Sequence, residues 1–215
     1  MSRVIGIMGE SGSGKTTACR NLDPQTTFYI DADQKGLSWK GWKSQYNSES
    51  RNYYRGSDIQ KVRTLLHKIN TEQTHIKVIV VDTINAIMID DEFARMQEKG
   101  YDKWADMAAS VYGIVLASHQ MRDDLTFVYL AHTQTERDDN GYQFTRIKTS
   151  GKKLDKIVLE SKFTTVLLAK CANGEHVFET KAKNSTAKTP MGLFDEAEVP
   201  NDIVTIIKAM EAYES

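Results

Sequence analysis

The sequence of 215 residues has few prolines, few cysteines and no long hydrophobic run. With three prolines in all, it contains no proline-rich linker of the kind that separates domains. Two cysteines, Cys19 and Cys171, are too few for a disulfide framework, which is typical of proteins from a reducing compartment. The longest aliphatic run, residues 78–81, is far shorter than the roughly 20 residues of a membrane-spanning helix. We therefore expect a cytoplasmic protein without a membrane partner.

An excess of charge of one sign is also lacking. Lys and Arg number 28 against 29 Asp and Glu, so the formal net charge is −1. A protein that binds nucleic acid with its whole surface needs a strong positive balance, so any such contact must come from a local patch. Hydrophobic residues make up 40% and charged residues 27%, as in ordinary folded proteins. The length favours one domain over residues 1–215.

Apolar runs alternate with segments of helical periodicity, which predicts an α/β fold with a mostly parallel central sheet flanked by helices. The predicted strands are residues 3–8, 26–31, 52–56, 77–82, 125–131, 164–169 and 176–181, the last two paired as a late antiparallel hairpin. The predicted helices are 15–21, one capped by Asp58, a stretch up to about residue 121 that is interrupted at Gly100, 152–162, and a terminal helix opened by Pro200. Residues 133–150 are polar and predict a long loop or hairpin.

A glycine-rich segment after the first predicted strand matches the phosphate-loop pattern G-x-x-x-x-G-K-[ST] at every fixed position. Its residues, with the one that follows, are Gly9, Glu10, Ser11, Gly12, Ser13, Gly14, Lys15, Thr16 and Thr17. The glycines allow successive backbone N–H groups to point at a phosphate, and the next helix adds its positive N-terminal end. Lys15 is predicted to reach the β- and γ-phosphates, and the Thr16 hydroxyl to ligate Mg²⁺. This segment predicts ATP and Mg²⁺ as cofactors.

The apolar run at residues 78–81 ends in a carboxylate, Asp82. Many buried strands end in Asp, so this feature alone is not specific. Beside a complete phosphate loop, an acid at the C-terminal end of a central strand is placed to hold Mg²⁺. We therefore predict that Asp82 and Thr16 form the metal site.

The order of three further segments resembles the ATPase core of RecA-type recombinases. They are Tyr29-Ile30-Asp31-Ala32-Asp33, Val78-Ile79-Val80-Val81-Asp82 and Tyr129-Leu130-Ala131-His132. The resemblance runs from Val4 to about Phe194 and is closest in type to the small phage-encoded RecA-like ATPases associated with single-strand annealing. It implies a RecA-like P-loop core and hydrolysis of the γ-phosphate of ATP, in the host cytoplasm if the chain is phage-encoded. It also implies a homo-oligomer with ATP at subunit interfaces, and a single-strand annealing or single-strand-binding protein as partner.

The same resemblance implies roles for four residues. Asp33, where RecA has Glu, polarises the attacking water, and His132, where RecA has Gln, senses the γ-phosphate. Lys181 and Lys183 match a Lys-x-Lys pair that reaches the neighbouring subunit's γ-phosphate, and on a strand two such lysines project to one face. The structural alternatives are that Asp33 caps a strand end, that His132 is a packing residue, and that the lysines protect a strand edge.

Segment 133–150 occupies the place of the family's second DNA-binding loop. Its candidate single-stranded-DNA contacts are Tyr142, Phe144, Arg146 and Lys148. Aromatic side chains that stack on bases, interleaved with cations that follow the backbone, are typical of sequence-tolerant single-strand binding. Three acids of the same segment, at 136, 138 and 139, favour the alternative of a solvated hairpin.

The leading interpretation is an ATP-dependent, single-stranded-DNA-binding ATPase of recombination or replication. In it, Asp33 orients water, Lys15 and Mg²⁺ stabilise the developing charge, and His132 couples phosphate state to the DNA loop. One alternative is an ATP-switched assembly module with little hydrolysis that partners a helicase or annealing protein. Another is a P-loop kinase of a small molecule, although Arg137 and Arg146 are too sparse for an arginine-rich lid.

Overall fold

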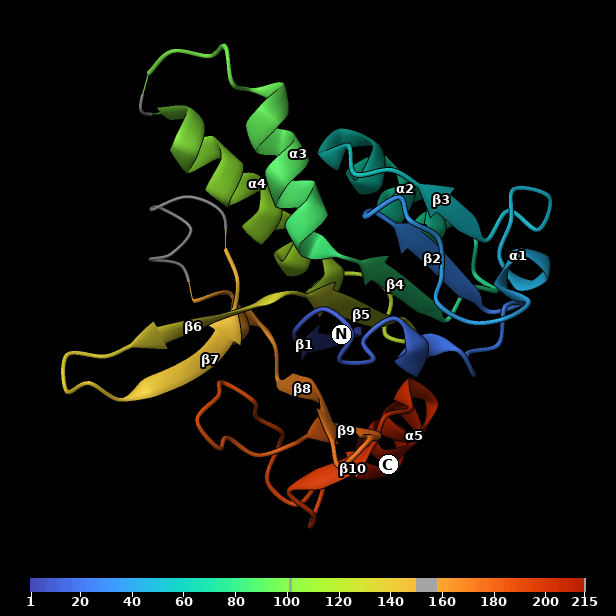
Figure 1. Cartoon of the computed structure of the whole chain (residues 1–215). Coiled ribbons are helices and arrows are strands. Elements are labelled where there is room, and N and C mark those ends of the chain that lie inside the picture. Colours follow the sequence, from blue (N-terminus) through green and yellow to red (C-terminus); the bar gives the residue numbers. More distant parts are fainter. Residues whose placement is uncertain (101, 150–157, 215) are drawn as a thin grey trace.

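The computed structural model describes residues 1–100, 102–149 and 158–214, with only the backbone of 102–105, 108 and 172. Within them an eight-stranded sheet has the order β3-β2-β4-β5-β1-β8-β9-β10 (Figure 1). The strands are β1 (Arg3–Met8), β2 (Thr27–Asp31), β3 (Tyr53–Arg55), β4 (Val78–Asp82), β5 (Thr126–Ala131), β8 (Thr165–Ala172), β9 (Glu175–Glu179) and β10 (Glu198–Pro200). Neighbours from β3 to β8 are parallel, whereas the β8–β9 and β9–β10 pairs are antiparallel. This arrangement confirms the predicted α/β P-loop fold with its late antiparallel hairpin.

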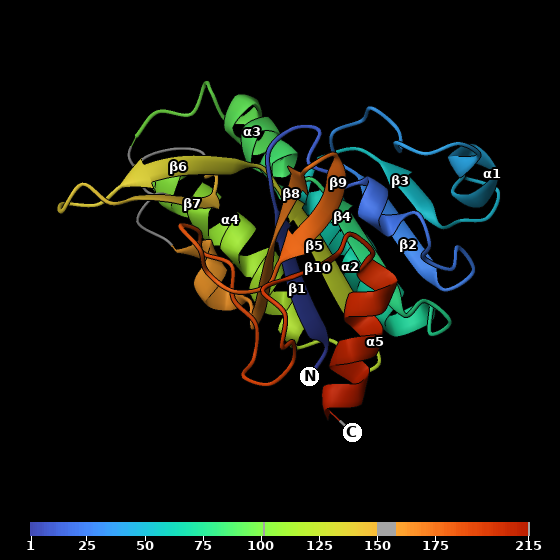
Figure 2. The ribbon, with the colours of Figure 1, turned by 60° about the horizontal axis from the view of Figure 1, so that its bottom comes forward.

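Helices cover both faces of the sheet, as Figures 1 and 2 show. The helical segments are η1 (Thr17–Cys19), α1 (Trp42–Gln45), α2 (Ile59–Glu72), α3 (Ile84–Ala94), α4 (Asp102–His119), η3 (Leu159–Lys162) and α5 (Ile203–Glu214). Helices α2, α3 and α4 pack in one apolar cluster, whereas η1 and α5 pack in a second one. The central strands contribute alternate residues to the two clusters, which is why they are apolar without interruption.

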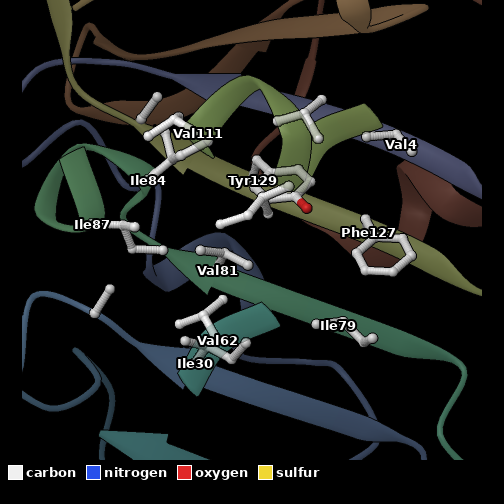
Figure 3. Close-up of a cluster of buried hydrophobic side chains, with 14 of the residues drawn as sticks. Val4, Ile30, Val62, Ile79, Val81, Ile84, Ile87, Val111, Phe127 and Tyr129 are labelled. Carbon is white, nitrogen blue, oxygen red and sulfur yellow. The ribbon is translucent and has the colours of Figure 1, made fainter. Parts of the chain in front are cut away.

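The core on the α2–α4 face consists of buried apolar side chains from the sheet and the helices. Figure 3 shows Val81 and Tyr129 of the sheet against Ile84, Ile87 and Val111 of the helices. Helix α2 begins where predicted, because the Asp58 carboxylate accepts hydrogen bonds from the backbone N–H groups of residues 60 and 61. None of the described helices combines the length and apolarity needed to cross a bilayer.

Three predicted helices differ from the structure. The one expected over residues 15–21 is the single 3-10 turn η1, which ends at Cys19. Pro200 ends β10, and α5 starts at Ile203. Of the helix predicted over residues 152–162, the part up to 157 lies outside the described residues, and the part from Leu159 is the 3-10 turn η3. That residues 1–215 form one domain stays a prediction.

Residues 133–147 form a second, two-stranded sheet, so the predicted loop or hairpin is a hairpin. Its strands β6 (Thr133–Arg137) and β7 (Gln143–Ile147) pair antiparallel with Thr133 opposite Ile147. This hairpin extends away from the main sheet, and β6 starts two residues after β5 ends (Figure 1). The position of the hairpin therefore depends on the end of β5.

Candidate nucleotide site

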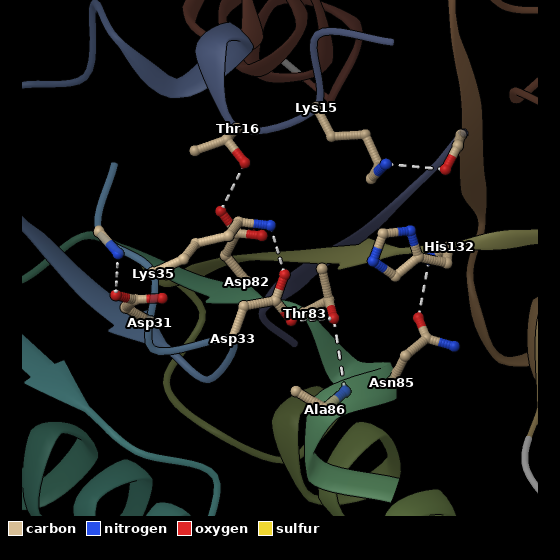
Figure 4. Close-up of polar contacts among 12 residues, drawn as sticks. Lys15, Thr16, Asp31, Asp33, Lys35, Asp82, Thr83, Asn85, Ala86 and His132 are labelled. Carbon is tan, nitrogen blue, oxygen red and sulfur yellow. Dashed lines mark hydrogen bonds and ion pairs between the residues drawn. The ribbon is translucent and has the colours of Figure 1, made fainter. Parts of the chain in front are cut away.

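The sheet order brings the predicted site residues to one edge. Strand β5 lies between β1 and β4, and all three are parallel to β2, so their C-terminal ends meet at the same edge. The phosphate loop follows β1, Asp82 ends β4, His132 follows β5 and Asp33 follows β2. Figure 4 shows these side chains, drawn from separate segments, facing a common space.

The phosphate loop has the curled backbone that its glycines predict. Gly12 and Gly14 have φ values of +80° and +95°, a region that side chains with a Cβ rarely adopt. A Cβ at Gly9 would lie 2.6 Å from the carbonyl oxygen of Ala169. The buried Lys15 ammonium donates hydrogen bonds to the carbonyls of Gly9 at 2.7 Å and Glu10 at 2.8 Å. Burial lowers the pKa of Lys15 to about 8, so an incoming phosphate would favour its charged form.

Thr16 and Asp82 lie together, as a shared metal ion requires. The Thr16 hydroxyl and the Tyr29 hydroxyl each donate a hydrogen bond of 2.8 Å to Asp82 Oδ2. Asp82 Oδ1 is buried without a hydrogen-bond partner among the described residues, so one carboxylate oxygen remains for a further ligand. Burial raises the pKa of Asp82 above its usual value, as expected for an acid that lacks its counter-cation.

This donor set fits Mg²⁺. A hydroxyl and a carboxylate are the hard oxygen ligands that Mg²⁺ prefers, and Mg²⁺ takes its other ligands from phosphates and water. Within the described residues no group of three or more His, Cys, Asp or Glu could hold a metal by itself. Thr16 and Asp82 would therefore hold Mg²⁺ together with a bound nucleotide.

The two acids after β2 have different positions. Asp31 faces the turn, where its Oδ2 accepts hydrogen bonds from the Gly36 N–H at 2.8 Å and the Tyr53 hydroxyl at 2.6 Å. Asp33 faces the nucleotide edge, and its carboxylate accepts from the Thr83 hydroxyl at 2.8 Å and the Lys35 ammonium at 2.5 Å. The cap of the strand end is thus Asp31, which leaves Asp33 for the site.

His132 shares a cavity with Asp33. The cavity has a volume of about 360 Å³ and is also lined by Lys35, Thr83 and Asn85. Burial and the nearby positive charge of Lys15 lower the pKa of His132, so its imidazole is neutral near pH 7. A neutral imidazole can donate one hydrogen bond to a phosphate or a water in this cavity.

Asn85 connects the site to the hairpin β6–β7, and the sequence analysis did not predict this role. Its side-chain oxygen accepts from the backbone N–H of His132 at 2.7 Å, and its amide nitrogen donates to the carbonyl of Lys148 at 2.6 Å. The Thr133 hydroxyl donates to Glu10 Oε1 at 2.6 Å, which ties β6 to the phosphate loop. The available signal was an amide at a buried position in the first turn of an apolar helix.

Among the predicted DNA contacts, the prediction for Arg146 is wrong, because its side chain does not face solvent. Its side chain is buried and forms ion pairs with Glu136 at 3.2 Å and Glu160 at 3.7 Å. The buried Glu160 carboxylate needs a cation, and β7 turns Arg146 toward it. Tyr142 and Lys148 are exposed, and Phe144 is half-buried.

The predicted geometry of the late lysines is also wrong. Strand β9 ends at Glu179, so Lys181 and Lys183 lie beyond it and do not share a strand face. The Lys181 ammonium donates to the carbonyl of Asp195 at 2.7 Å. Their reach to a neighbouring subunit stays a prediction.

A second cavity, of about 610 Å³, opens beside the phosphate loop. Thr17 and Arg20 of the η1 region line it together with His176 and Asn201, and His176 Nδ1 lies 3.1 Å from the Ser13 carbonyl. Asn201 Nδ2 is buried and has no hydrogen-bond partner within the part of the chain that the structure describes. Such an amide is suited to a ring nitrogen of a base.

Comparison with known proteins identifies a family for most of the chain. Residues 1–190 match a family model described as AAA domain. Among solved structures, a KaiC-like protein from the hyperthermophilic archaeon Pyrococcus horikoshii is similar, with a TM-score of 0.44 and 12% identity over 82% of this chain and 76% of that chain. No curated protein matches.

Proposed function

Because this chain belongs to the AAA domain family of P-loop ATPases, we propose that it hydrolyses Mg-ATP and transmits the nucleotide state to a hairpin that binds single-stranded DNA. One observation carries the proposal. His132 lines the same cavity as Asp33, and the hairpin β6–β7 begins at the residue after His132. A change in the contacts of His132 at the γ-phosphate would therefore alter the position of the first residue of the hairpin, Thr133.

The chemical step is attack of water on the γ-phosphorus. The new P–O bond forms as the bond to the β–γ bridging oxygen breaks, which yields ADP and inorganic phosphate. Asp33 orients the water and accepts its proton, and Lys15 stabilises charge on the phosphoryl oxygens. When bound, Mg²⁺ neutralises phosphate charge as a Lewis acid. His132 donates a hydrogen bond to a phosphoryl oxygen or to the water.

The exposed side chains of the hairpin support the proposed binding of single-stranded DNA. Tyr142 is 50% exposed, and Arg137 and Lys148 are exposed cations on the two strands or next to them. Tyr142 and Arg137 lie near the tip of the hairpin, and Lys148 lies at its base. Base stacking on Tyr142 and phosphate contacts by the two cations would therefore follow the length of the hairpin, a local contact that is consistent with the net charge of −1. The proposed roles are in recombination or replication, as a homo-oligomer that works with an annealing or single-strand-binding protein.

A second candidate is an ATP-switched assembly module with little hydrolysis. The observation that favours it is that both oxygens of Asp33 already accept hydrogen bonds. These bonds outweigh the effect of burial and hold the pKa of Asp33 below its usual value, which makes it a weaker base. This candidate predicts tight ATP binding with very slow turnover.

The test is Mg²⁺-dependent ATP hydrolysis with and without single-stranded DNA, with duplex DNA as a control. Lys15→Ala should abolish turnover. Tyr142→Ala should remove stimulation by single strands, whereas Tyr213→Ala on α5, also 50% exposed, should retain it. Turnover that ignores DNA would refute the hairpin's role and leave the ATPase proposal standing. ATP binding without turnover would favour the assembly module.

A further inference from the structure

Lys35 is the cation of the nucleotide site that neither the phosphate loop nor the resemblance accounts for. It lies on the turn after β2, and its ammonium contacts Asp33 Oδ2 at 2.5 Å. The Lys35 side chain is 54% exposed, whereas the Asp33 side chain is 15% exposed. The lysine thus reaches from solvent onto an acid that faces the cavity (Figure 4).

The turn that carries Lys35 is held without this ion pair. Gly36 has a φ of +82°, and its N–H is bound by the Asp31 carboxylate. The guanidinium of Arg55 donates to the Gln34 carbonyl at 2.8 Å. These contacts fix the backbone on both sides of Lys35, so the four-carbon side chain can move its ammonium while the turn stays in place.

The Lys35 ammonium lies within the electrostatic reach of the whole phosphate edge. Besides Asp33, it interacts favourably with Asp82 and Asp31. It also acts on Lys15 and His132, whose pKa values its positive charge lowers further, after the larger effect of burial. A γ-phosphate between Lys15 and His132 would therefore compete with Asp33 for this cation.

We propose that Lys35 is a γ-phosphate ligand acting in cis. In the nucleotide-free protein it holds Asp33 Oδ2, and when ATP binds it transfers its ammonium to the γ-phosphoryl oxygens. The transfer releases one oxygen of Asp33 for the attacking water, and it provides a second cation, after Lys15, for the charge that develops there. The inference rests on the proposed ATPase function and adds a catalytic residue to it.

This role makes the site distinguish ATP from ADP. ADP has no γ-phosphate, so with ADP bound Lys35 returns to Asp33. The distinction can be measured as binding alone, which separates it from hydrolysis.

The experiment compares Lys35→Met, which keeps the length of the side chain, with Lys35→Arg and the control Lys40→Met, an exposed lysine of the same segment. Dissociation constants for Mg-ADP and for a non-hydrolysable ATP analogue are measured by displacement of a fluorescent nucleotide. Single-turnover hydrolysis and thermal unfolding of the nucleotide-free proteins are measured in parallel.

For Lys35→Met we expect about 10-fold weaker binding of the analogue with unchanged binding of ADP. Hydrolysis should fall by about 100-fold, and Lys35→Arg should recover part of both losses. The unfolding temperature of the nucleotide-free Lys35→Met protein should fall by at most about 4 °C, because an ion pair with an exposed partner contributes little to the free energy of unfolding. Lys40→Met should behave as the wild type throughout.

Equal loss of ADP and analogue binding, or no change in either, would overturn the assignment, as would faster hydrolysis in Lys35→Met. The two proposals fail in different ways. If the wild type does not hydrolyse ATP but Lys35→Met still loses the preference for the analogue, hydrolysis is refuted and Lys35 remains a γ-phosphate ligand. If the wild type and Lys35→Met hydrolyse ATP equally, only the Lys35 inference is refuted.

Discussion

Replacing Asn85 by alanine should lower the free energy of unfolding by about 2–4 kcal/mol. Asn85 is 3% exposed, and its side chain forms hydrogen bonds with two backbone groups, the N–H of His132 and the carbonyl of Lys148. Alanine leaves both without this partner, and a buried unpaired polar group costs about 1–3 kcal/mol. Since Lys148 is exposed, water can reach part of this region, so the lower half of the summed range applies.

The expected fall in unfolding temperature is about 4–16 °C, since 1 kcal/mol corresponds to about 2–4 °C for a chain of this size. Asn85→Asp should cost at least as much as alanine. It can still accept from His132, but it turns a second oxygen toward the Lys148 carbonyl. Urea unfolding measures the free energy, and hydrogen exchange measures protection of the His132 amide.

Asn140→Ala, at the exposed tip of the hairpin, is the control and should change the free energy of unfolding by less than about 0.5 kcal/mol. ATP binding should survive in Asn85→Ala because the phosphate loop is intact, while stimulation by single strands should fall. If Asn85→Ala is as stable as the control and exchange at His132 is unchanged, the proposed link between α3 and the hairpin is refuted.

Three further predictions concern charged groups. Burial raises the pKa of Asp82, so its charged form destabilises the folded protein near neutral pH. Asp82→Asn should therefore raise the unfolding temperature of the nucleotide-free protein and abolish the Mg²⁺ dependence of ATP binding. A lower unfolding temperature in this variant would contradict the reasoning. Arg146→Gln should cost about 3–5 kcal/mol in urea unfolding because it leaves Glu160 buried and unpaired, whereas Lys148→Gln should be nearly neutral; similar losses for both would refute the inward placement. Since the pKa of Lys15 is about 8, ATP binding at that pH should take up protons, as measured by calorimetry in buffers of different ionisation enthalpy, and the uptake should vanish in Lys15→Arg.

The sequence alone determined the phosphate loop and the sheet that carries it. The loop depends on residue types at adjacent positions. Gly12 and Gly14 have positive φ values, which glycine adopts without strain and other residues rarely adopt. The strands β1, β4 and β5 are buried on both faces, so their apolar runs are visible without knowing their neighbours. Local patterns were sufficient here because the responsible interactions are local or depend only on burial.

The tertiary structure decided where the other side chains point. The residue type and sequence neighbours of Arg146 suit a DNA contact, yet the side chain points inward and pairs with Glu160 from a separate segment. Asp31 and Asp33 have the same chemistry and similar neighbours in sequence, but Tyr53 binds one and Thr83 the other. These outcomes depend on partners brought together by the order of strands in the sheet, and no local pattern contains that order. The contacts of Lys35 and Asn85, which link the nucleotide edge to its catalytic acid and its hairpin, exist for the same reason.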